Sequence, residues 1–70
     1  MTRILPTYTE TRLRAVLATQ RAIHPGANDQ LLADYCAEVL TGGCGDDLAL
    51  TNAADQVMTL MAREHVERGR

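Results

Sequence analysis

Apolar residues recur along this chain at a spacing of three or four positions in three stretches, which are separated by segments rich in glycine, proline and polar residues. This spacing places them along one face of an α-helix, so it predicts three amphipathic helices at about 7–23, 28–41 and 52–68. The predicted apolar faces consist of Leu13, Val16, Leu17 and Ile23, then Leu31, Leu32, Tyr35, Cys36, Val39 and Leu40, and finally Val57, Met58, Leu60, Met61 and Val66. The sequence therefore predicts an all-α fold, a compact bundle of three short helices.

Capping signals indicate where each helix begins. Thr7 and Glu10 fit a capping box, in which a threonine hydroxyl and a glutamate carboxylate bind each other's free amides. Asn28 is a favourable N-cap for the second helix, and Asn52 is the expected N-cap of the third. The first helix should end before Pro25, because a proline disfavours helical dihedral angles in the residue that precedes it.

The segment LTGGCGDDLALTN, residues 40–52, places glycines, a cysteine and two adjacent aspartates between the second and third helices. Gly42 or Gly43 should supply the left-handed residue that commonly ends a helix, and an aspartate can cap the next turn. The chain has no lysine for a phosphate-binding P-loop, and the aspartates lack the alternating spacing of an EF-hand. We interpret the segment as a glycine-rich joint, with contact to a partner protein as the alternative. Leu48 and Leu50 form either the first turn of the third helix or a short helix of their own.

A length of 70 residues allows one domain, which we take to span 1–70 with residues 1–6 as an N-terminal arm. A domain of this size buries only about 60% of the surface that its unfolded chain exposes, so its stability is low. The apolar residues Ile4 and Leu5 make the arm either a packed extended segment or a frayed end.

The sequence shows neither a signal peptide nor a run of apolar residues long enough to cross a membrane. We therefore expect a cytoplasmic protein with reduced thiols. Cys36 lies on the apolar face of the second helix, where a cysteine usually acts as a small buried hydrophobe. If the chain reverses at the glycines, Cys36 and Cys44 could instead form a disulfide, which in the cytoplasm would be a redox switch.

Cysteine and histidine are also zinc ligands, and the chain has two of each, at Cys36, Cys44, His24 and His65. Their spacing includes no C-x-x-C or H-x-x-x-H pair, and each ligand would come from a different segment. We therefore expect neither a metal site nor a cofactor.

The net charge of −2 is small, but the charges are segregated along the chain. Residues 1–27 carry four arginines and one glutamate, whereas residues 28–55 carry six carboxylates and no basic residue. These regions could attract each other within one fold or between two copies. The residues that we expect to contact a partner are Arg12, Arg14, Arg21, Asp34, Glu38, Asp46, Asp47, Met58 and Met61, although the two methionines also fit a helical core.

Nothing in the chain brings a nucleophile and a base together, so we do not expect an enzyme. Our hypothesis is a small helical protein–protein interaction module, with a homodimer as one form of the assembly. In that class, a regulator or inhibitor of a larger bacterial or phage-encoded protein fits the size of the chain. The alternative is a helix-turn-helix DNA-binding regulator, in which Asn52 and Gln56 read base edges and the arginines of the first helix contact phosphates. The long joint and the nearby aspartates weigh against that alternative.

Overall fold

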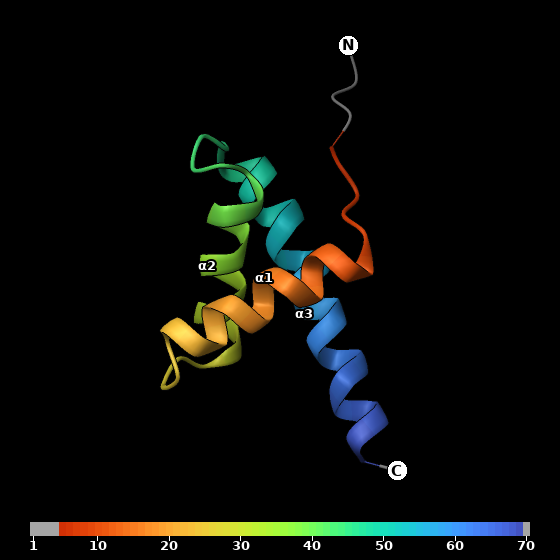
Figure 1. Ribbon diagram of the computed structural model, residues 1–70. Helices are drawn as coiled ribbons and strands as arrows, with labels where there is room; N and C mark the ends of the chain where they lie inside the picture. The colour runs from red at the N-terminus through yellow and green to blue at the C-terminus, as the bar shows by residue number, and fades with distance from the viewer. Residues whose placement is uncertain (1–4, 70) are drawn as a thin grey trace.

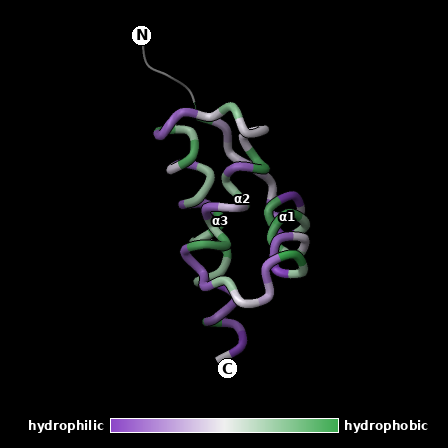
Figure 2. Tube along the Cα trace, turned by 90° about the vertical axis from the view of Figure 1, so that its left-hand side faces the viewer, coloured by the Kyte–Doolittle hydropathy of each residue, from purple (hydrophilic) through white to green (hydrophobic). Residues whose placement is uncertain are grey.

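The structure is a computed structural model that describes residues 5–69, and these form three helices and no strand (Figure 1). The helices are α1 (Glu10–Ile23), α2 (Asp29–Leu40) and α3 (Asp47–Arg68). α2 and α3 run side by side in opposite directions, and α1 crosses one face of this pair. Seen from the side, α1 forms a separate layer against α2 and α3 (Figure 2). The predicted all-α bundle of three helices is confirmed.

The N-cap of α1 differs from the expected one. Thr9 is the N-cap, and its Oγ1 accepts a hydrogen bond of 3.2 Å from the backbone N–H of Arg12. The predicted capping box of Thr7 with Glu10 is wrong, because Glu10 is already the first helical residue and Thr7 belongs to an extended segment. The Glu10 carboxylate still favours the positive end of the helix dipole. The end of α1 at Ile23, before Pro25, is as predicted.

α2 begins and ends as the sequence predicts. Asn28 is the N-cap, and its Oδ1 accepts a hydrogen bond of 2.9 Å from the N–H of Leu31. At the other end Gly42 and Gly43 have φ angles of 71° and 77°, which residues with a Cβ rarely adopt. The N–H of Gly43 donates to the carbonyl of Glu38, the bond that defines a Schellman cap.

α3 begins five residues earlier than predicted, so Asn52 as its N-cap is wrong. Asp46 is the N-cap, and its Oδ1 accepts a hydrogen bond of 2.9 Å from the N–H of Ala49. Leu48 therefore lies in the first turn of the third helix, the first of the two alternatives left open by the sequence. The early start reduces the joint to residues 41–46.

The core lies between the three helices and consists mostly of leucine and alanine. Its buried members are Leu13, Leu17, Leu32, Ala33, Cys36, Ala37, Leu40, Ala53, Val57, Leu60 and Met61. The predicted face of α2 is rotated from the observed one: Leu31 and Val39 are exposed, whereas Ala33 and Ala37 are buried. The reason is that α2 packs against two helices at once, and alanines allow α3 to approach closely. Ile23, Met58 and Val66 are likewise exposed rather than in the core.

The extended segment before α1 packs against α3. Pro6 O accepts hydrogen bonds from Asn52 Nδ2 at 2.9 Å and from Gln56 Nε2 at 3.0 Å. The N–H of Tyr8 donates to Gln56 Oε1 at 2.8 Å, and the tyrosine ring packs on the core. Residues 5–6 of the predicted arm therefore take the packed form, whereas residues 1–4 lie outside the described part of the chain.

Truncation of a buried leucine should destabilise the protein far more than truncation of an exposed valine. Leu17 is 1% exposed, so Leu17→Ala should lower the free energy of unfolding by about 2–5 kcal/mol through lost burial and a cavity. Val66 is 62% exposed, and Val66→Ala should change the free energy of unfolding by less than about 0.5 kcal/mol. Urea unfolding followed by circular dichroism measures both values. Equal losses in the two variants would contradict this assignment of the core.

Candidate functional site

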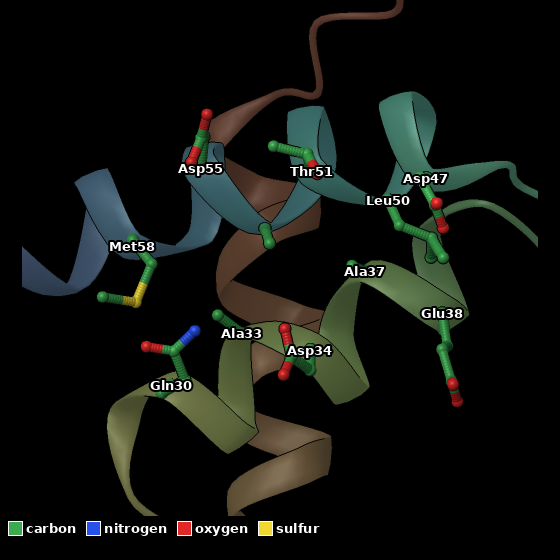
Figure 3. A pocket seen from close by; sticks show the side chains of 11 residues that line it. Gln30, Ala33, Asp34, Ala37, Glu38, Asp47, Leu50, Thr51, Asp55 and Met58 are labelled. Atoms are coloured by element: carbon green, nitrogen blue, oxygen red, sulfur yellow. The ribbon is translucent and has the colours of Figure 1, made fainter.

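The largest concave surface that we describe is a groove between α2 and α3, on the side of this pair that faces away from α1. Figure 3 looks into this groove, with α1 behind the two helices. The groove has a volume of about 480 Å³. We call it the α2/α3 groove.

The walls of the α2/α3 groove are two rows of polar residues. On each helix the row follows a spacing of four residues, which keeps side chains on one face of a helix. The rows are Gln30, Asp34 and Glu38 on α2, and Asp47, Thr51 and Asp55 on α3. Since a helix rises 1.5 Å per residue, each row is about 12 Å long, or roughly two helical turns.

The floor of the α2/α3 groove is apolar and made mostly of small side chains. It consists of Ala33, Ala37, Leu50 and Ala54, and Met58 lies at the end opposite to Glu38 and Asp47. Ala33 and Ala37 are also buried in the core, so the floor of the groove is the outer edge of the α2–α3 contact. A helix with small side chains could approach this floor closely.

Every charged residue that lines the groove is acidic. Asp34, Glu38, Asp47 and Asp55 are exposed, and none of them forms an ion pair with any other residue among 5–69. In the same part of the chain, no group of three or more His, Cys, Asp or Glu side chains is placed to hold a metal ion. The carboxylates are thus spread along two walls, a distribution that suits an extended cationic partner.

The arginines of α1 lie away from the groove, and Arg14 and Arg21 pair with a carboxylate outside it. Glu64 on α3 lies 3.7 Å from Arg14 and 3.5 Å from Arg21, and its side chain is only 16% exposed. Glu10 joins the same network, at 3.0 Å from Arg63 and 3.5 Å from Arg14. Among residues 5–69, the ion pairs of the α1 arginines are therefore with Glu10 and Glu64, which both lie outside the acidic region at 28–55.

Sequence reasoning missed the central place of Glu64 in this network. The spacing of four residues between Glu64 and Arg68 predicts only a local ion pair, which the structure contains at 4.0 Å. The same spacing predicts a pair of Arg63 with Glu67, but Arg63 contacts Glu10 instead. The contacts between helices depend on how α1 crosses α3, and no local pattern reports that crossing.

Arg12 stands apart from the other arginines of α1. It is exposed and makes no ion pair with any residue of the described chain. Of the two candidate methionines, Met58 is 40% exposed at the groove, whereas Met61 is 2% exposed in the core. Asp46 caps α3, and Asp47 lines the groove.

The structure also places the residues of the DNA-binding alternative. Asn52 and Gln56 donate to Pro6 O, and Gln56 also accepts from the N–H of Tyr8. Their amides are therefore committed to the extended segment rather than presented to a base edge. The joint of 41–46 is also longer than the three- or four-residue turn of a helix-turn-helix.

The two cysteines are free thiols in different surroundings. Cys36 is fully buried, and Cys44 is exposed in the joint. Burial raises the pKa of the Cys36 thiol above its ordinary value, and the nearby Arg21 guanidinium offsets only part of this rise. The histidines are also separated, since His24 stacks on Tyr35 at 4.0 Å while His65 Nε2 lies 3.3 Å from Asp29 Oδ2.

Comparisons of the chain with protein-family models, curated proteins and solved structures gave no match. Among the described residues, no helix is both long and apolar enough to cross a membrane.

The two thiols should differ strongly in reactivity. At mildly alkaline pH, Cys44 should react rapidly with a disulfide reagent such as DTNB, whereas Cys36 should react no faster than the protein unfolds. Because the folded state raises the Cys36 pKa, its contribution to stability is present below the ordinary thiol pKa and is lost as pH rises through the raised value. In the Cys44→Ser variant only the buried Cys36 thiol remains, so the absorbance change of the reagent measures its reaction rate alone. A rapid reaction of that variant would contradict the burial of Cys36.

Proposed function

We propose that this chain is a small, non-enzymatic protein-binding module whose α2/α3 groove receives a cationic helix of its partner. The observation that carries this proposal is the combination of an apolar floor with four wall carboxylates that have no partner among residues 5–69. A basic helix would neutralise the wall carboxylates and cover the apolar floor of the groove.

Electrostatics favour such a partner. Four charges of one sign along one groove, without an ion-pair partner among residues 5–69, repel each other and destabilise the free protein. Lysine or arginine side chains placed along both walls would offset this repulsion and steer the encounter. Burial of the apolar floor would also contribute to binding. At one end of the groove, the exposed Met58 is a flexible side chain that can adapt to different surfaces.

The shape of the α2/α3 groove favours a helix over other partners. A helix bound in a groove presents apolar residues at intervals of three and four positions, and it carries charges on both flanks. Two turns of such a helix match the length of about 12 Å that we obtain for each wall. Small residues on the inserted face would fit the alanine floor without displacing α2 or α3.

A module that acts only by binding would work as a regulator or inhibitor of a larger protein or complex. The small size of the chain supports this role, and a bacterial or phage-encoded target is part of the same hypothesis. We place its action in the cytoplasm, because a buried free thiol and an exposed free thiol suit a reducing compartment.

A synthetic peptide tests the groove directly. The probe is a capped helical peptide of alanine and lysine, with a continuous alanine stripe flanked by lysines. It should shift the amide NMR signals of residues 30–38 and 47–58 in the dilute protein. Neutralisation of two wall carboxylates, Asp34→Asn with Glu38→Gln, should weaken binding by about two- to thirtyfold, because each exposed ion pair contributes about 0.2–1 kcal/mol.

Glu67→Gln is the matched control, because this exposed carboxylate lies on α3 outside the groove. It should leave the affinity for the lysine peptide unchanged. A peptide of the same design with glutamates in place of lysines should not bind. Equal affinities for the lysine and glutamate peptides, or shifts that map to α1, would refute the proposal.

A further inference from the structure

The outward face of α1 is a candidate binding surface that the function proposed above does not use. At 3.6 residues per turn, four exposed residues with small side chains fall on one line opposite the buried face of this helix. They are Thr11, Ala15, Ala18 and Ala22. This stripe is about 16 Å long, so it is slightly longer than a wall of the α2/α3 groove.

Arginines flank the small-residue stripe of α1 on both sides. Arg12 lies along one flank, and Arg14 and Arg21 lie along the other, as their positions on the helical wheel require. Arg12 has no ion-pair partner within residues 5–69, and the side chain of Arg14 remains 45% exposed beside its glutamates. The face therefore has the two properties that the groove requires of its occupant, a small apolar stripe and basic flanks.

We infer that α1 of a second copy of this chain is an occupant of the α2/α3 groove. In this contact the alanine stripe of one copy lies on the alanine floor of the other. Arg12 of the inserted helix faces one acidic wall, and Arg14 and Arg21 face the other. The inference rests on the proposed function, because it names the occupant of the same groove.

The geometry dictates the kind of assembly that results. The outward face of α1 and the groove lie on opposite sides of the molecule, since α1 covers one face of the α2/α3 pair and the groove opens on the other (Figure 2, Figure 3). Two copies therefore cannot exchange both contacts in a closed pair. The interface joins different surfaces head to tail, and each added copy leaves one free groove and one free α1 face.

The assembly should be weak and sensitive to salt. One helix seated over two turns of a groove buries less than the roughly 1,600 Å² of a typical stable interface. Much of the attraction comes from exposed charges, which salt screens over about 10 Å at 0.1 M. The mean mass should thus rise steadily with protein concentration, without a plateau at the dimer, and fall as salt is raised.

Sedimentation velocity over a concentration series tests the inference with two single-surface variants. Ala18→Glu places a bulky acid on the α1 stripe, and Asp34→Arg with Glu38→Arg reverses one wall of the groove. Each variant should remain monomeric at concentrations where the wild-type chain assembles. Ala62→Glu, which alters an exposed alanine on α3 outside both surfaces, should assemble like the wild type.

A mixture of the two variants gives the decisive result. The Ala18→Glu chain keeps an intact groove, and the groove variant keeps an intact α1, so an equimolar mixture should form a one-to-one complex that cannot grow further. Failure of the mixture to form this complex, when both variants keep the circular dichroism spectrum of the wild type, would overturn the inference. So would a wild-type chain that stays monomeric at every concentration.

The lysine peptide separates this inference from the function on which it rests. If the wild-type chain is monomeric but its groove binds the peptide, the second copy is excluded as an occupant and the cationic-helix site stands. If neither the peptide nor a second copy binds, both proposals fail.

Discussion

The close packing of α2 against α3 is the contact on which the rest of the structure depends. Small buried side chains at Ala33, Ala37 and Ala53 allow these two helices to approach each other. On one side of the pair, the larger residues Leu60 and Leu17 meet and form the core under α1. On the other side, Ala33 and Ala37 are part of the shallow apolar floor between two polar rows. Core and groove are therefore two sides of one helix pair.

This arrangement also separates the charges. Arg14 and Arg21 of α1 pair with Glu64 on α3, whereas the carboxylates of the groove face solvent on the opposite side of the helix pair. A protein of this size has little stability in reserve. Acidic residues that line a groove and have no ion-pair partner in the described part of the chain lower the stability of the free protein, and binding would offset this loss. We regard these carboxylates as the strongest indication of function.

The polar residues of α3 show how structure constrains the choice between functions. Asn52 and Gln56 have side chains suited to reading base edges, but they hold the backbone at Pro6 and Tyr8. These hydrogen bonds join residues that are 46 to 50 positions apart, and they fix residues 6–8 against α3. In the fold, Asn52 and Gln56 therefore hold the extended segment against α3.

The sequence by itself determined the number of helices, the caps at Asn28 and Gly43, and most of the buried residues. These features arise from interactions within a few residues, such as the bond from Gly43 to Glu38, or from apolar periodicity along one helix. It also identified Asp34, Glu38 and Asp47 as candidates for partner contact, a role that remains a prediction.

Only the tertiary structure decided which of two plausible N-caps begins α3 and which face of α2 is buried. It also decided which carboxylate pairs with Arg14 and Arg21. Asp46 and Asn52 are both favourable N-cap residues locally, but Asp46 caps α3, whereas Asn52 lies within the helix and its amide donates to Pro6 O. The spacing of Leu31 and Val39 predicts core residues, but both are exposed. Ala33 and Ala37 are buried in their place, because α2 packs against two helices at once. The groove itself is a property of the helix pair, because its walls come from segments that approach only when the chain reverses at the glycines.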